Sequence, residues 1–351
     1  MKLLRKSCHA LMERKNLKNI SVVLLGLILL AIISGCTSTQ NQPKNAIASE
    51  KPLKTYDGKK VLYIDSYHEG YEWSDGITKG IKNILNDTGV ELKILRMDTK
   101  RNDTEEFGKQ AGLRAKSIID DFKPDVVIIS DDPAFKYLLM PYYKDAALPF
   151  VFCGINWDVS IYGAPYNNTA GMIEVSLIPK LITFLEEYSR GERLGFIAGN
   201  TSTDKKNAQY YNKLYNITFT KTYHVNTFEE WKESFQSLQE EVDVLILENN
   251  AGITDWNDLE AEAFVLENTK IPAGADQVWL SNDSLISLAK IPEEQGEWSA
   301  STALMILDGT PPLDIPIVTN KKGMLYVNLN IAEKLGAIIR PELLKNAQII
   351  R

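Results

Sequence analysis

The feature that most constrains the fold is a regular alternation of short apolar runs with stretches of helical spacing, which begins near residue 60. Each apolar run leads into a polar loop, as where residues 61–64 are followed by Asp65 and Ser66. Strands that alternate with helices pair in parallel, and short strands without a polar face suit a sheet that is covered on both sides. The sequence therefore predicts an α/β protein built from doubly wound, Rossmann-like parallel sheets.

This alternation occurs in two series that share one plan but no fixed-period identity. A stretch rich in Gly, Pro and Asn at residues 162–171 separates the two series. The expected strands lie at residues 61–64, 91–97, 126–129 and 149–152, then at 194–198, 217–223, 242–247 and 271–275, with a late strand at 325–329. The expected helices lie at residues 74–86, 104–122, 178–189 and 293–307, with a further helix that ends at Gly336.

The N-terminus has the layout of a secretory signal. Six Lys and Arg residues precede an apolar run at residues 20–33. That run is shorter than the roughly 18 to 20 residues that a membrane-spanning helix needs. It ends in Ile33-Ser34-Gly35-Cys36, which resembles the bacterial lipobox and predicts cleavage after residue 35 and lipidation of Cys36. The alternative is an ordinary membrane anchor with a chance cysteine. Residues 36–57 are polar and show no apolar period, so we expect a flexible tether.

Removal of residues 1–35 would leave 316 residues, more than one hydrophobic core usually spans, so two lobes are expected. We assign residues 58–162 with about 290–311 to an N-terminal lobe, and 163–289 with about 312–351 to a C-terminal lobe. The cleaved chain would keep 33 of the 39 Lys and Arg residues and 45 of the 46 Asp and Glu residues, a formal charge of −12 that makes nucleic acid an unsuitable partner. Cys153 would be the one cysteine in the folded part, which excludes an internal disulfide.

Ligands of open parallel sheets bind beyond the carboxyl ends of the strands, where loops converge and helix N-termini offer unpaired N–H donors. The residues at these positions are aromatic, hydroxyl and amide side chains with a few acids. This set suits an organic ligand with an apolar or planar part and an ionic head. Ser130, Asn200 and Asp276 have an alternative role as helix caps. The candidate ligand-binding residues are Ser66, Tyr67, His68, Tyr71, Trp73, Ser130, Asp131, Asn156, Trp157, Asn200, Thr201, Asn249, Asn250, Asp276 and Gln277.

Catalytic sites are less well supported by the sequence. His68 lies beside Asp65 and Ser66, which would suit a hydrolase, but there is no GxSxG motif and nothing indicates an oxyanion hole. Three histidines, one of them in the leader, give poor support for a His-based metal site, and the adjacent Asp131 and Asp132 rarely converge on one ion. No Gly-rich phosphate loop is present. We therefore expect neither an enzyme nor a bound metal or cofactor.

Four segments that span nearly all of the chain after its leader carry a resemblance to a known family: KVLYIDSYHEGYEWS at residues 60–74, LPFVFCGI at 148–155, LDGTPPLDIP at 307–316 and NLNIAEKLG at 328–336. Taken in order, they resemble the substrate-binding proteins of ABC transporters with the type I periplasmic-binding fold, to which some extracellular sensor domains are related. The branch that the chain resembles includes binding lipoproteins for tryptophan and tyrosine. The resemblance implies two lobes joined by three crossover segments, with a ligand cleft between them.

The leading hypothesis is an extracytoplasmic solute-binding lipoprotein of an ABC importer. It would capture an amino acid or a similar small organic molecule by hinge closure of its two lobes. Its partners would be that ligand and an ABC permease in the membrane, to which a lipid on Cys36 would hold it, and we expect a monomer. One alternative is a sensory lipoprotein that signals to a membrane kinase or cyclase. The other is an exported hydrolase that uses His68.

Overall fold

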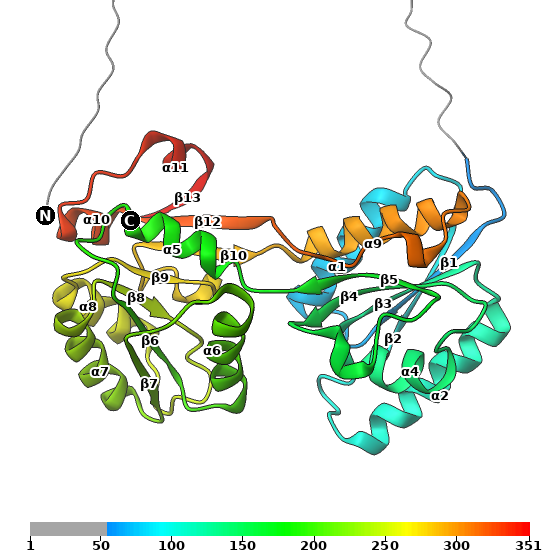
Figure 1. Ribbon diagram of the computed structural model, residues 1–351, viewed down its shortest axis with the longest axis horizontal. Helices are drawn as coiled ribbons and strands as arrows, with labels where there is room; N and C mark the ends of the chain where they lie inside the picture. Colours follow the sequence, from blue (N-terminus) through cyan, green and yellow to red (C-terminus); the bar gives the residue numbers. More distant parts are fainter. Residues whose placement is uncertain (1–54) are drawn as a thin grey trace, which may run out of the picture. The chain divides into compact units, whose positions relative to one another are not determined.

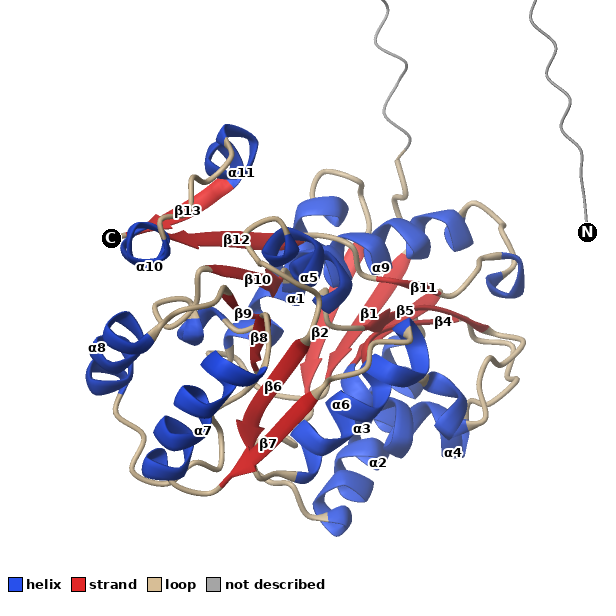
Figure 2. Ribbon diagram, turned by 60° about the vertical axis from the view of Figure 1, so that its left-hand side comes forward, coloured by secondary structure: helices blue, strands red, loops and turns tan. Residues whose placement is uncertain are grey.

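The structure, a computed structural model, describes residues 55–351 (Figures 1 and 2). The predicted signal peptide, Cys36 and nearly all of the predicted tether lie outside the described residues. The described chain contains two sheets flanked by helices, and almost every neighbouring pair of strands is parallel. The predicted α/β fold class with two lobes is confirmed.

The first lobe is built on a six-stranded parallel sheet in the order β11-β5-β4-β3-β1-β2. Its strands are β1 (Lys60–Asp65), β2 (Glu91–Arg96), β3 (Val126–Ser130), β4 (Phe150–Asn156), β5 (Thr169–Glu174) and β11 (Val318–Thr319). Its helical segments are α1 (Glu72–Leu85), α2 (Glu105–Phe122), α3 (Asp131–Ala134), η1 (Phe135–Leu139), α4 (Met140–Tyr142), η2 (Val159–Tyr162), α9 (Pro292–Leu307) and η4 (Pro312–Asp314).

Both faces of the first sheet are buried, as the apolar strands predict. On β1, Val61 and Tyr63 belong to a core cluster with α1 and α9, whereas Leu62 and Ile64 belong to a second cluster with α2 and η1. Figure 1 shows α1 and α9 over one face of the sheet and α2 over the other. The polar ends of these strands are thereby held at one edge by a rigid core.

The second lobe is built on a seven-stranded sheet in the order β13-β12-β10-β9-β8-β6-β7. Its strands are β6 (Leu194–Gly199), β7 (Lys221–Val225), β8 (Val244–Leu247), β9 (Ala273–Ala275), β10 (Ile286–Lys290), β12 (Gly323–Asn328) and β13 (Ala347–Ile350). Its helical segments are α5 (Ile178–Glu186), α6 (Ser202–Tyr215), α7 (Phe228–Glu241), α8 (Asp258–Asn268), η3 (Val278–Leu280), α10 (Leu329–Leu335) and α11 (Pro341–Asn346). β10 and β12 are antiparallel, and the other pairs are parallel.

The chain passes between the two sheets three times, after β5, after β10 and after β11. Hydrogen bonds hold these crossover segments together. Asn320 accepts from the Val175 N–H at 2.8 Å and donates to its carbonyl at 3.1 Å. Glu294, at the start of α9, accepts from the backbone N–H groups of Lys321 and Lys322 at 3.0 and 2.7 Å. The crossovers therefore form one connected hinge region.

Glycine residues allow α9 to lie very close to α1. A Cβ atom at Gly296 would lie 2.1 Å from the Ile77 carbonyl oxygen, and one at Gly80 would lie 2.3 Å from the Glu293 carbonyl oxygen. Real Cβ atoms do not approach backbone oxygen so closely, so this helix pair depends on both glycines. The contact joins a late helix to the first lobe.

The lobe boundaries differ from the predicted ones. Because β5 and β11 lie in the first sheet, the chain leaves that sheet after Glu174 instead of at residue 163, and after Thr319 instead of at 311. β5 reads TAGMIE and follows a stretch of turn-forming residues, so it has a weak strand signal. β10 and β13 were likewise not predicted, and β7 begins at Lys221 instead of at residue 217.

Candidate functional site

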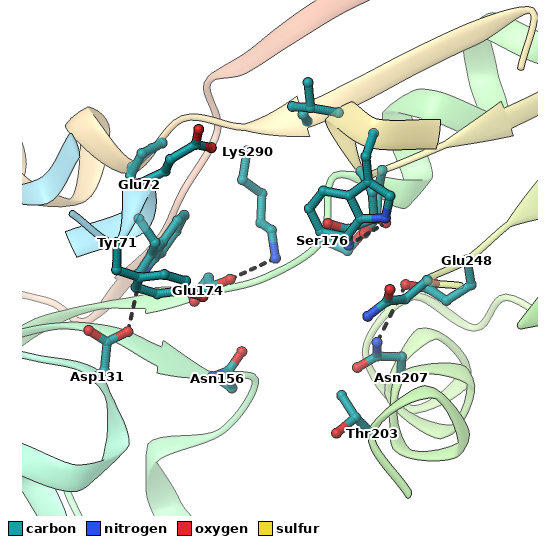
Figure 3. Close-up of a pocket in the computed structure, with 18 of the residues that line it drawn as sticks. Tyr71, Glu72, Asp131, Asn156, Glu174, Ser176, Thr203, Asn207, Glu248 and Lys290 are labelled. Carbon is teal, nitrogen blue, oxygen red and sulfur yellow. Dashed lines mark hydrogen bonds and ion pairs between the residues drawn. The ribbon is translucent and has the colours of Figure 1, made fainter. Parts of the chain in front are cut away.

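A cleft of about 440 Å³ lies where the carboxyl ends of strands from the two sheets face each other (Figure 3). Side chains at or beyond the ends of β1, β2, β3, β4 and β5 line it from the first lobe, and side chains at or beyond the ends of β6, β8, β9 and β10 line it from the second. The lining residues are Tyr67, Tyr71, Glu72, Trp73, Lys100, Asp131, Asn156, Trp157, Glu174, Ser176, Thr203, Asn207, Glu248, Asn249, Asp276, Gln277, Val278, Trp279, Ala289, Lys290 and Pro292. This volume suits a small organic molecule.

Aromatic rings surround a buried carboxylate on the wall of the first lobe. Tyr67 and Tyr71 meet edge to face with ring centroids 5.5 Å apart, and the Trp73 indole N–H donates to Asp131 Oδ1 at 3.0 Å. Asp131 is 2% exposed, and its Oδ2 has no hydrogen-bond partner among the described residues. Burial, and then the nearby Glu174, raise the pKa of Asp131 above its usual value. This wall therefore offers a desolvated carboxylate beside π faces.

Two more buried carboxylates form the wall of the second lobe. Glu248 is 3% exposed and accepts a hydrogen bond from the Tyr211 hydroxyl at 2.7 Å. Asp276 is 4% exposed and accepts from the Ser176 hydroxyl at 2.8 Å and from the Gln277 amide at 2.9 Å. Burial, and then the charge of Asp276, raise the pKa of Glu248 above its usual value. The hydrogen-bond donors to these two acids are all neutral.

An ion pair lies beside the crossovers at the back of the cleft. Lys290, at the end of β10, places its Nζ 2.6 Å from Glu174 Oε1 at the end of β5, and Figure 3 shows the two side chains pointing toward each other. Burial alone would lower the pKa of Lys290, but the carboxylates of Glu174 and Asp276 raise it above its usual value. Lys290 is therefore protonated at neutral pH.

Trp157 connects the two lobes through its side chain. It follows β4, its backbone has φ +63°, and its N–H donates to the Glu174 carbonyl at 3.0 Å. Its indole stacks on Tyr210 of α6 with centroids 5.4 Å apart and planes 11° apart, and its indole N–H donates to Asn207 Oδ1 at 3.1 Å. The left-handed backbone conformation, which is uncommon for tryptophan, turns this ring from the first sheet into the core of the second lobe.

The structure brings nine of the fifteen predicted binding residues to the cleft. They are Tyr67, Tyr71, Trp73, Asp131, Asn156, Trp157, Asn249, Asp276 and Gln277. They come from both lobes, so the rule that ligands bind beyond the carboxyl ends of parallel strands selects one common surface. Direct contact with a ligand stays a prediction for each of them.

Three predicted residues of the first lobe lie away from the cleft lining. Ser66 is fully buried, where its hydroxyl accepts from the Ala134 N–H at 2.8 Å. Ser130 is also fully buried, with its hydroxyl 3.0 Å from that of Tyr63. His68 Nδ1 lies 2.9 Å from the carbonyl oxygen of Glu69 in its own loop. The Ser66 and His68 side chains that suggested a hydrolase thus have other partners.

Three predicted residues of the second lobe also lie outside the lining. Thr201 caps α6 by accepting from the Asp204 N–H at 3.1 Å, and Asn200 donates to Asn226 at 2.9 Å. Asn250 accepts from the indole N–H of Trp279, a lining residue, at 3.0 Å. Thr201 can cap α6 because its hydroxyl group directly precedes the first residue of this helix.

Several lining residues were missed by sequence reasoning. Glu174 and Lys290 end β5 and β10, two strands that the apolar pattern did not predict. Glu248 directly follows β8 and immediately precedes the predicted Asn249, so the strand-end rule could have selected it. Thr203 and Asn207 lie inside α6, where only the orientation of the helix brings them to the cleft.

Between residues 55 and 351, no three His, Cys, Asp or Glu side chains are placed to hold a metal ion. None of the helices in this range combines the length and the apolarity needed to cross a membrane.

Comparison with known proteins identifies one family from the sequence and several similar folds from the structure. A family model described as ABC transporter substrate binding protein matches residues 71–350. A ligand-free, open substrate-binding protein with adhesive properties from Clostridium difficile has a TM-score of 0.63 and 17% identity, over 84% of this chain and 99% of that one. A conserved domain protein from Vibrio cholerae has a TM-score of 0.53 and 17% identity over the same shares of the two chains. No curated protein matches the chain.

A third similar structure contains a ligand. It is an ABC domain from Streptococcus pneumonia in complex with L-Trp, with a TM-score of 0.50 and 18% identity, over 84% of this chain and 99% of that one. At these identities the structural matches establish the shared fold. The match of the family model extends over both lobes and all three crossovers.

Proposed function

Because the chain belongs to the ABC transporter substrate-binding protein family, we propose that it is the extracytoplasmic solute-binding component of an ABC importer. It would hold an amino acid or a similar small organic molecule and present it to a permease in the membrane. A lipid on Cys36, followed by the tether, would keep it at the outer face of that membrane as a monomer. The observation that carries this proposal is a cleft lined from both lobes at the carboxyl ends of their strands.

The chemistry of the lining supports a small organic ligand with an apolar or planar part and an ammonium group. Trp73 and the two tyrosines offer ring faces for an apolar or planar part, and Asn156 and Gln277 offer amides that can fix its orientation. The buried Asp131 can pair with an ammonium group. The related fold that holds L-Trp is a further reason to begin with amino acids.

Hinge closure is the proposed mechanism of capture. The three crossovers are held together by Asn320 and Glu294, so they can bend as one unit while each lobe stays rigid. A ligand that contacts both walls only when the lobes are closed favours the closed state by its difference in affinity for the two states. A permease that recognises the closed state would then receive only loaded protein.

Thermal-shift screening tests this proposal. The purified protein, freed of ligand by unfolding and refolding and checked by native mass spectrometry, is screened against amino acids and related small molecules. A ligand at about 100 times its Kd is expected to stabilise the protein by about 2.7 kcal/mol. Small-angle X-ray scattering should then show a smaller radius of gyration with the ligand than without it.

A pair of variants separates binding at the cleft from general stabilisation. Trp73→Ala, in the lining, should lower the affinity for the ligand at least tenfold. Tyr142→Ala, which removes an exposed ring on α4, should leave the affinity unchanged. If nothing in a broad panel stabilises ligand-free protein, or if both variants bind equally well, the proposed function is wrong.

A further inference from the structure

The side chains buried at the cleft carry more negative than positive charge. The carboxylates of Asp131, Glu174, Glu248 and Asp276 are each less than a tenth exposed. Within the described part of the chain, Lys290 is the one cation in the lining that is not fully exposed; it is half-buried, and its Nζ is already 2.6 Å from Glu174. Three buried carboxylates are therefore left without a cationic partner of their own.

Exposed charges at the cleft do not change this balance. Glu72 and Lys100 also line the cleft, but both are solvent-exposed and their charges are opposite. The ammonium group of the exposed Lys100 lies 5.2 Å from the ring centroids of both Tyr67 and Tyr71. Screening by water makes such exposed charges weak partners for a buried carboxylate.

Asp131 is the clearest open position for a cation. Its Oδ1 accepts from the Trp73 indole N–H at 3.0 Å, whereas its buried Oδ2 has no partner among the described residues. Figure 3 shows its carboxyl group pointing from one wall of the pocket toward Tyr71 and Glu174. A buried carboxylate next to aromatic faces favours a protonated amine or an amidine, which gains both an ion pair and a cation–π contact.

Glu248 and Asp276 provide a second open position on the opposite lobe. Their hydrogen bonds come from a phenol, a hydroxyl and the side-chain amides of Asn207 and Gln277, which leave the two negative charges uncompensated. The residues between 55 and 351 place no metal-binding group here. Two carboxylates that repel each other gain most from a positive charge placed between them.

Taking the proposed function as its basis, we propose that the ligand of this cleft is an organic dication without a carboxylate. One protonated amino or amidino group pairs with Asp131 between aromatic rings, and the other pairs with Glu248 and Asp276 on the second lobe. Such a ligand bridges the two walls and leaves one negative charge in place of three. An amino acid carries a carboxylate into the same surface, where it meets the buried like charges, a lysine that is already paired and the exposed Lys100.

Matched pairs of ligands test this inference by calorimetry on purified, ligand-free protein. Cadaverine is compared with lysine, and agmatine with arginine, because the two members of each pair differ by one carboxyl group. Pentylamine serves as the monocation of the same length as cadaverine. We expect each decarboxylated dication to bind at least about tenfold more tightly than its amino acid, and cadaverine to exceed pentylamine by the same factor.

The outcomes distinguish this inference from the proposed function. If lysine or arginine binds as tightly as its amine, or if an uncharged or zwitterionic solute binds while the dications do not, the ligand class is wrong and the solute-binding function stands. If no amine and no member of the broad solute panel binds, both are wrong.

Variants locate the two ends of the ligand. Asp131→Asn keeps an acceptor for Trp73 and a residue type that tolerates the left-handed backbone at φ +66°, and Glu248→Gln keeps an acceptor for Tyr211. Each change should weaken cadaverine at least about tenfold, with the two factors multiplying in the double variant. Pentylamine should respond to only one of the two changes.

A surface variant provides the control for these measurements. Asp120→Asn, which removes an exposed carboxylate 2.8 Å from Lys116, should leave all affinities unchanged. Melting temperatures of the variants check that each one folds. Full cadaverine affinity in folded Asp131→Asn protein would overturn the inference.

Discussion

Asp283 is a buried acid that should make the stability of the second lobe depend on pH. It lies in the loop between η3 and β10, is 2% exposed, and its Oδ1 has no hydrogen-bond partner among the described residues. Burial, and then the nearby Glu262 and Asp258, raise the pKa of Asp283 from 3.8 to about 7. The perturbation that tests this is Asp283→Asn, which keeps the shape of the side chain and removes its charge.

The size and sign of the effect follow from linkage. Between pH 3.8 and about 7 the folded state holds a proton that the unfolded state has released, so stability falls as pH rises through this range and is constant above it. At 1.36 kcal/mol for each pKa unit, the full penalty in the native protein is roughly 4 kcal/mol at pH 8. Because the loop and nearby water relax around the charge, we expect Asp283→Asn to gain about 3 kcal/mol, or roughly 5 °C in melting temperature.

Differential scanning calorimetry at a series of pH values measures this gain. The difference in melting temperature between Asp283→Asn and the native protein should be near zero at pH 3.5, grow until about pH 7.5, and then stay constant. Asp120→Asn, an exposed carboxylate, should change the melting temperature by less than 1 °C at every pH, since surface substitutions rarely exceed about 0.5 kcal/mol. A gain for Asp283→Asn that does not vary with pH, or a loss at pH 8, would refute the reasoning.

Three further changes probe the helix contact, the cleft and the link between lobes. Gly296→Ala places a Cβ atom 2.1 Å from the Ile77 carbonyl oxygen, so it should lower the free energy of unfolding in urea by about 2 to 3 kcal/mol. An unchanged urea concentration at the unfolding midpoint would contradict this prediction. Burial raises the pKa of Asp131 and of Glu248, so a larger fraction of both carboxyl groups is ionised at pH 8 than at pH 5, and cadaverine should bind more tightly at pH 8. Equal affinity at both pH values in calorimetry would argue against ionised Asp131 and Glu248 as its partners. Trp157→Ala removes the ring that joins the lobes, so X-ray scattering should give a larger radius of gyration for the ligand-free variant than for the ligand-free native protein. An unchanged radius of gyration would mean that the crossovers alone fix the positions of the lobes.

Much of the fold was predictable because apolar spacing and caps are local signals. The helix predicted at residues 104–122 is α2, and its start is set by Thr104, which accepts from the Phe107 N–H at 3.3 Å. β5 and β10 were missed for a physical reason, since their burial depends on neighbouring strands and on crossovers that are distant in sequence. β10 reads ISLAK, a run that is too short and too mixed to predict a buried strand by itself.

A residue of the candidate site could be predicted only where the strand before it could be predicted from the sequence. Asp131, Asn156 and Asp276 follow strands that the apolar pattern predicts, and all three line the cleft. Glu174 and Lys290 end strands that it does not predict, so the strand-end rule could not select them. The excess of buried negative charge was invisible in the sequence, because it depends on which acids lose contact with water.

The contact made by Trp157 has a consequence for the energetics of lobe motion. The indole lies nearly parallel to the Tyr210 ring, at 11°, and the backbone N–H of Trp157 donates to the end of β5, where the first crossover begins. A small slide of two parallel ring faces keeps most of each face covered, whereas separation would wet both. Rotation of the lobes along this plane therefore exposes less of the indole to water than a movement that separates the rings. Less of the free energy gained from a solute is then consumed by exposing a hydrophobic side chain during closure.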